Sequence, residues 1–127
     1  MLSFTDCASR YCTVHYLKSR TEVYEKLKGY IVWVKTLSNI SDATIAYSIK
    51  IIQAYKAAEY ERKERHKICA DNGIHTKYAS PTLHENAAVA ERVWETIQDA
   101  RRVVMYTAKF MKSEWLLAFS RATYIYN

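Results

Sequence analysis

Apolar residues recur at intervals of three and four along most of this chain, which is the spacing of an amphipathic helix. The clearest early case is residues 21–38, where the apolar positions are Val23, Leu27, Tyr30, Val34 and Leu37. These positions fall on one face of a helix. Residues 5–18 have a looser pattern, which predicts a short first helix with Thr5 or Asp6 as its N-cap.

A second helical stripe starts after Ser41 and is lost beyond Tyr55, where charged residues crowd every face. Within residues 56–73 acids precede bases at helical spacing, as in Glu59–Lys63 and Glu61–Arg65. Each such pair stabilises a helix by about 0.2–0.5 kcal/mol. We therefore expect a long helix over 41–72 whose second half is an exposed strut. Gly73 would end it, and the loop 73–81, with His75, Lys77 and Tyr78, would be a contact tip.

The third strong pattern follows Pro81, where Thr82 and Glu85 have the spacing of a capping box. Beyond it the apolar positions keep a three-four alternation, at Ala90, Val93, Ile97, Ala100, Val104, Thr107 and Met111. This pattern predicts a long helix over 82–112. With only two glycines and one proline to interrupt the chain, we expect an all-α fold. It would be a bundle of four or five helices, with 41–72 and 82–112 as a long antiparallel hairpin.

The size and composition favour one folded domain over residues 1–127. The chain has 127 residues, of which 50% are hydrophobic and 25% charged, enough to close one core. Its net charge of +6 is spread along the sequence. A local excess of basic residues follows Asp99 and gives a candidate anion-binding set: Arg101, Arg102, Lys109 and Lys112.

Three cysteines, an odd number without an apolar signal segment before them, favour a reducing compartment. We therefore expect an intracellular protein of the cytoplasm or nucleus. The first twenty residues have only one acid, so a mitochondrial presequence and a location in the matrix are an alternative. The longest apolar runs, such as residues 115–119, are too short to span a bilayer.

Candidate chemistry is sparse. Thiols and imidazoles that zinc favours occur at Cys7, Cys12, His15, His66 and Cys69, but their spacing matches no zinc module, and we expect no metal and no cofactor. The chain has no Gly-x-Ser-x-Gly elbow, glycine-rich phosphate loop or His-Glu-x-x-His pair. We therefore expect no enzymatic activity.

Aromatic residues are the strongest functional signal, because the chain has eleven tyrosines and three tryptophans. Tyrosine and tryptophan commonly anchor protein interfaces. The expected partner-binding residues are Tyr78, Lys109, Trp115, Phe119, Tyr124 and Tyr126. The sequence thus predicts a non-enzymatic helical interaction module, a small subunit or adaptor of a larger assembly. A second copy of the chain is an alternative partner, and a basic nucleic-acid-binding protein is an alternative function.

Two segments resemble parts of a known family. Residues 30–56, "YIVWVKTLSNISDATIAYSIKIIQAYK", resemble the opening two helices of a fungal-type cyclin box. Residues 101–115, "RRVVMYTAKFMKSEW", are similar to the following helix, with Ala108, Lys109 and Phe110 matching its motif. This resemblance implies a regulatory subunit of a protein kinase in which Lys109 contacts the kinase.

Overall fold

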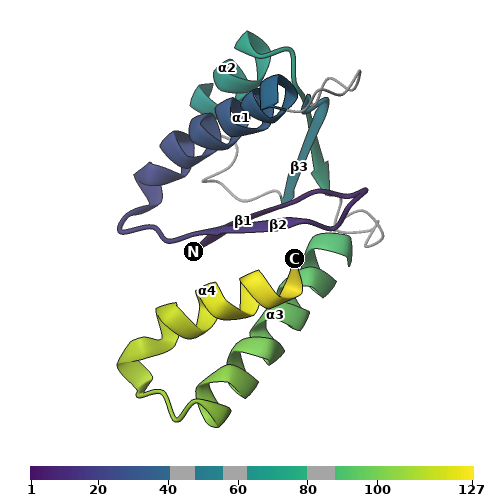
Figure 1. Cartoon of the computed structure of the whole chain (residues 1–127). Coiled ribbons are helices and arrows are strands. Elements are labelled where there is room, and N and C mark those ends of the chain that lie inside the picture. The colour runs from purple at the N-terminus through teal and green to yellow at the C-terminus, as the bar shows by residue number, and fades with distance from the viewer. Residues whose placement is uncertain (41–47, 56–62, 80–87) are drawn as a thin grey trace. The chain divides into compact units, whose positions relative to one another are not determined.

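The computed structural model describes residues 1–40, 48–55, 63–79 and 88–127. The chain forms two compact units, one made of Met1–Tyr16 with Ala87–Asn127 and the other of Leu17–Asn86 (Figure 1). Within the described ranges there are four α-helices and two sheets of two strands each, so the prediction of an all-α bundle is wrong. None of the described helices is long and apolar enough to cross a membrane. The expectation of one domain over 1–127 stays a prediction.

The first unit begins with a hairpin instead of the predicted helix over 5–18. Strand β1 (Leu2–Thr5) pairs antiparallel with β2 (Cys12–His15), with Leu2 opposite His15 and Thr5 opposite Cys12. The β-branched residues Thr5, Thr13 and Val14 suit extended backbone. The polar residues between the strands form a hydrogen-bonded turn, so Asp6 stabilises a turn and does not cap a helix.

The rest of this unit is a helical hairpin. Helix α3 (Ala88–Thr107) is followed by a turn, a short 3-10 helix (Lys112–Glu114) and α4 (Trp115–Tyr126). The predicted helix over 82–112 therefore ends five residues early, at Thr107. The chain then reverses direction through Lys109, which has a φ of 53°. In this unit α3 contacts β1, and α4 contacts both α3 and β2 (Figure 1).

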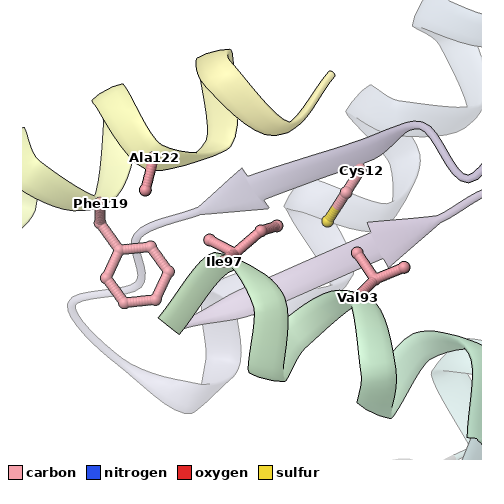
Figure 2. Packing of buried hydrophobic residues seen from close by; sticks show 5 residues of the cluster. All are labelled: Cys12, Val93, Ile97, Phe119 and Ala122. Atoms are coloured by element: carbon pink, nitrogen blue, oxygen red, sulfur yellow. The ribbon is translucent and has the colours of Figure 1, made fainter. Parts of the chain in front are cut away.

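The core of the first unit lies between the helical hairpin and β2. Figure 2 shows five of its buried side chains, which converge from three elements: Cys12, Val93, Ile97, Phe119 and Ala122. Val93 and Ile97 are four residues apart on α3, as the predicted stripe required. Small side chains at Ala118 and Ala122, both fully buried, let α4 approach its neighbours closely.

The last residue of the chain is bonded to the hairpin by its side chain. The amide of Asn127 accepts a hydrogen bond from the backbone N–H of Cys12 at 2.9 Å and donates one to the carbonyl of Cys12 at 2.8 Å. One side chain thus satisfies both backbone groups of an edge-strand residue, as a neighbouring strand would. This pairing fixes the end of α4 to β2.

The second unit contains α1 (Val23–Ile40), β3 (Ile51–Tyr55), α2 (Lys63–Asp71) and β4 (His75–Ala79). The helix predicted over 21–38 is confirmed in α1, and Leu27 on its predicted face is buried. Strands β3 and β4 are parallel, with Ile51 opposite His75 and Tyr55 opposite Ala79. A parallel pair needs a crossover between its strands, and α2 lies in that connection.

The predicted single helix over 41–72, with its exposed strut, is wrong in the described part. Residues 51–55 form a strand, and in α2 the side chain of Arg65 is only 3% exposed while Ile68 and Cys69 are buried. The predicted loop tip at 73–81 is also wrong, because His75, Lys77 and Tyr78 lie in β4. The start of the predicted helix at 41–47, most of the strut at 56–62 and the capping box at 82–85 lie outside the described residues.

The end of α2 confirms the predicted role of Gly73. Its φ is +66°, and its N–H donates to the carbonyl of Ala70 at 3.0 Å. The N–H of Ile74 donates to the carbonyl of Cys69 at 2.8 Å. These two bonds form a Schellman motif, which satisfies the last carbonyls of the helix and needs a left-handed residue at this position.

The two glycines provide a matched pair of substitutions. No atom lies within 4 Å of a Cβ built at either one, so only the backbone distinguishes them. We expect Gly73→Ala to lower the free energy of unfolding by about 1–2 kcal/mol because alanine is strained at positive φ. Gly29→Ala, inside α1, should raise it by about 0.5–1 kcal/mol. Urea unfolding followed by circular dichroism measures both, and equal effects would contradict the Schellman geometry.

Truncation of the core should show how much the first unit depends on Phe119. Because this ring is only 1% exposed, we expect Phe119→Ala to reduce the free energy of unfolding by about 3–5 kcal/mol. The control is Tyr106→Ala on α3, where the ring is 86% exposed and the change should stay within about 0.5 kcal/mol. Similar urea midpoints for the two variants would show that Phe119 is not a core residue.

Candidate interaction surface

Helix α4 has a buried face and an exposed apolar face. Ala118, Phe119 and Ala122 face the core, whereas Leu117 and Tyr124, seven residues apart, are 60% and 74% exposed. Residues seven apart lie nearly above one another, two turns along a helix. The exposed residues therefore form a strip along the outer side of α4.

An arginine lies within this strip. The guanidinium carbon of Arg121 is 5.4 Å from the centroid of the Tyr124 ring, at cation–π distance. Arg121 is also one helical turn from Leu117, so the order along the strip is Leu117, Arg121, Tyr124. We call these three residues the α4 strip. Their i, i+4, i+7 spacing was present in the sequence, but Leu117 and Arg121 were not predicted as partner-binding residues.

An aromatic cluster holds the start of α4 in place. Trp115 makes edge-on contacts with Tyr16 and Phe119, at centroid distances of 6.3 and 6.4 Å. The hydroxyl of Tyr16 donates to the carbonyl of Leu116 at 3.0 Å and lies 3.0 Å from the hydroxyl of Ser120. The Trp94 ring also packs on Phe119, at a centroid distance of 5.2 Å. These contacts fix α4, and with it the α4 strip.

The predicted partner-binding aromatics have different environments. Phe119 is 1% exposed and belongs to the core, so its assignment to a surface is corrected. Tyr126 packs partly buried against that core, and Trp115 lies at its rim, 36% exposed. Tyr124 is well exposed. Tyr78 pairs with Ala54 between the strands of the second unit, and its partner-binding role stays a prediction.

The predicted anion-binding residues do not share one face. The guanidinium of Arg101 is held over the Phe119 ring at 5.6 Å, and the neighbouring Arg102 forms an ion pair with Asp99. Adjacent helical residues point in different directions. Lys109 and Lys112 are exposed in the turn and in the 3-10 helix that follow α3. The structure thus does not bring the four predicted residues together.

The turn at Lys109 also bears on the segments of the cyclin resemblance. Ala108, Lys109 and Phe110 form the reversal between α3 and α4, so residues 101–115 are not one helix. Residues 51–55, within the segment that resembles the second cyclin helix, are strand β3. The resemblance itself stays a prediction.

The turn between β1 and β2 is fixed by one carboxylate. Asp6 Oδ2 accepts hydrogen bonds from the hydroxyl of Ser9 at 2.6 Å and from its backbone N–H at 2.7 Å. The two bonds from Ser9 are the main cause that lowers the pKa of Asp6; burial opposes them, and the backbone N–H of Ala8 and the positive charge of Arg10 add smaller lowering effects. The backbone N–H of Arg10 donates to the carbonyl of Asp6 at 2.9 Å. The conformation of the turn is therefore tied to the ionised state of Asp6.

The cysteines and histidines show no metal-binding arrangement in the part of the chain that the structure describes, where no group of three or more His, Cys, Asp or Glu could hold an ion. Cys12 and Cys69 are buried in different units, and burial raises the pKa of both thiols. Thr5 donates a hydrogen bond to the sulfur of Cys12 at 3.6 Å. Both thiols are therefore protonated at neutral pH and pack as small apolar groups.

Comparison with known proteins finds similarity to a sequence relative and to solved structures, whereas no family model matches the chain. The chain is 27% identical over 126 residues to the retrovirus-related Pol polyprotein from transposon TNT 1-94 of Nicotiana tabacum. The match covers 99% of this chain but only 9% of the polyprotein. The fold is similar to that of a chain in the cryoEM structure of the simian T-cell lymphotropic virus intasome in complex with PP2A regulatory subunit B56 gamma. That similarity has a TM-score of 0.70 at 14% identity and covers 96% of this chain and 40% of the other.

The Asp6 turn predicts a pH dependence of stability. Because the pKa of Asp6 is lowered by folding, its contribution is present above the unfolded pKa of about 3.9 and is lost as the pH falls through the folded pKa. Asp6 is largely exposed, so solvent screening limits the contribution to about 1 kcal/mol or less. We expect Asp6→Asn to unfold at lower urea concentration than the wild type at about pH 6, and at nearly the same concentration at about pH 2.5.

Ser9→Ala is the control for this turn, because it removes only the hydroxyl donor and leaves the backbone donor in place. Its effect at about pH 6 should be smaller than that of Asp6→Asn. A difference in urea midpoint between Asp6→Asn and the wild type that stays constant with pH would contradict the assignment of the pH dependence to ionised Asp6.

Proposed function

We propose that this chain is a protein-binding subunit of an assembly of the intasome kind and that it binds its partner through the α4 strip. The observation that carries the proposal is the similarity of almost the whole chain to a chain in the structure of a viral intasome in complex with another protein. The transposon polyprotein relative supports it independently, because that match comes from sequence and also covers almost the whole chain.

The extent of the matches defines what this subunit would be. The chain corresponds to 9% of the transposon polyprotein and to 40% of the matched chain in the intasome structure. It is therefore comparable to one domain of each, and a domain of a larger protein commonly presents a surface to neighbouring domains or subunits. This supports the sequence-based interpretation of a small subunit or adaptor.

The composition of the α4 strip suits a protein interface. Tyrosine and arginine are enriched among the residues that dominate binding energy, and leucine adds apolar area around them. The Arg121 guanidinium is already stacked on Tyr124, so less side-chain entropy remains to be lost on binding. Buried contacts on the opposite side of α4 hold the helix in place. Less conformational entropy of the α4 strip is therefore lost on binding.

Four further expectations accompany this proposal. We expect the chain to bind without enzymatic activity, to need no cofactor or metal, to act inside the cell and, as an alternative, to associate with a second copy of itself. The lysine at the α3–α4 turn, Lys109, remains the residue that would contact a kinase if the cyclin resemblance reflects function. Detection of a bound protein kinase would favour that alternative.

Nucleic-acid binding is the second candidate function, and the net charge of +6 supports it. Binding to phosphates weakens steeply with salt, whereas an interface of apolar and aromatic residues does not. Measuring partner retention at about 50 and 200 mM salt therefore separates the two functions.

Co-purification tests the proposed interface. We expect the tagged chain to retain a protein partner, identified by mass spectrometry, and the double variant Leu117→Ser/Tyr124→Ala to lose at least about 90% of it. Loss of two interface anchors commonly costs over about 2 kcal/mol. Both substitutions are on an exposed face and should leave the unfolding midpoint unchanged.

The matched control is Val32→Ser on α1, because Val32 is 59% exposed and Leu117 is 60% exposed. It removes an apolar side chain of the other unit that is exposed to the same fraction as Leu117, and the partner should be retained. An equal loss of partner in the control and in the double variant, or retention in both, would rule out the α4 strip as the interface.

A further inference from the structure

A hollow of about 260 Å³ in the first unit collects basic and hydroxyl side chains that are far apart in the sequence. Arg10 comes from the β1–β2 turn and Tyr126 from the end of α4. Helix α3 contributes residues spaced as one face, which are Val89, Arg92, Val93 and Thr96. A larger hollow along α3 is lined by that helix alone, and its lining includes Glu95 and the ion pair of Asp99 with Arg102.

The charge of the smaller hollow is unbalanced. Two of its lining residues are arginines, and none of the described residues that line it is acidic. The Nε–H of Arg92 donates to the carbonyl of Ala88 at 3.2 Å. That bond holds the guanidinium at the first turn of α3. It uses only Nε, so the two terminal nitrogens of Arg92 take no part in it. Arginine presents such nitrogens as a fork that fits a phosphate.

Arg10 is held in an unusual backbone conformation beside this hollow. Its φ is 67°, a left-handed value that is less favourable for a residue with a Cβ than for glycine. Glycine or asparagine would suit this turn better. The bonds of Asp6 to Ser9 and the bond from the Arg10 N–H to Asp6 maintain the turn. A strained residue that places a charged side chain at a hollow indicates a role beyond folding.

Hydroxyl and apolar groups complete the lining. The phenol of Tyr126 and the hydroxyl of Thr96 are uncharged polar groups, and Thr96 donates to the carbonyl of Arg92 at 2.8 Å, which holds its side chain at the wall. Val89 and Val93 give an apolar side. Guanidinium groups suit the phosphate of a nucleotide chain, and a phenol with apolar walls suits its sugar and base. The net charge of +6 attracts a polyanion.

We infer that Arg10 and Arg92 bind a phosphate of a nucleic-acid backbone in this hollow. The site differs from the basic set predicted from the sequence and from the α4 strip, so it goes beyond the proposed protein interface. Binding of protein through the α4 strip and binding of nucleic acid through Arg10 and Arg92 can each be present without the other.

The test is fluorescence anisotropy with labelled single-stranded DNA, duplex DNA and RNA of about 20 nucleotides, at about 50 and 200 mM salt. We expect Arg10→Gln and Arg92→Gln each to raise the dissociation constant about tenfold, because each removes a charge-assisted contact. The slope of log affinity against log salt should fall by about 0.7–0.9 per variant. The controls Lys18→Gln and Lys28→Gln remove the same charge from exposed positions of the other unit and should change affinity less than about twofold.

Arg10→Gly separates binding from folding. Glycine removes the guanidinium and also relieves the left-handed strain, so this variant should lose affinity as Arg10→Gln does while its urea midpoint rises. Loss of binding together with gain of stability cannot come from misfolding. Inorganic phosphate should compete with the labelled strand at millimolar concentration.

Three results would overturn the assignment. The first is equal loss of affinity in the lysine controls and the arginine variants, which would show binding by total charge alone. The second is no binding of any of the three nucleic acids below about 10⁻⁴ M, the weak end of non-specific affinity. The third is phosphate binding without nucleic-acid binding, which would indicate a small-anion site.

Discussion

The first unit depends on burying Ile97 and Phe119 against the strand that carries Cys12. These side chains are at most 1% exposed, and they come from the two ends of the chain. A hairpin of two four-residue strands is marginal alone in water, and a helix of twelve residues is marginal as well. Their shared core makes each of them stable, and it also positions the α4 strip and the hollow beside Arg10.

The helices could be predicted where an apolar stripe was long enough to need burial. Helix α1 follows the stripe from Val23 to Leu37, and α3 buries the Val93 and Ile97 that its stripe contains. The end of α2 could be predicted because the left-handed backbone that ends many helices favours glycine, and Gly73 has that conformation. These features are local, so the sequence around them carries the information.

The strands could not be predicted from the same pattern because a short apolar run fits both periods. Ile49, Ile52 and Tyr55 have helical spacing, yet residues 51–55 are extended because β4 pairs beside them. That partner lies twenty or more residues away along the chain. The prediction of candidate site residues was limited for the same reason, because their exposure depends on contacts between distant parts of the sequence. Tyr124 was identified as a surface aromatic, but only packing distinguishes it from the buried Phe119, and only the hairpin turn brings Arg10 near Arg92.

The first unit is assembled from both ends of the chain, with the whole of Leu17–Asn86 between its parts. The hairpin is synthesised before the second unit, whereas Val93, Ile97 and Phe119, against which it packs, are synthesised after that unit. Contacts of such large sequence separation form slowly, because a long loop must close before they contribute. The second unit can therefore fold early. At that stage β1 and β2 do not yet have α3 and α4 to pack against. The apolar side of the hairpin therefore stays exposed until α3 and α4 have been synthesised, and exposed apolar surface of this kind promotes aggregation.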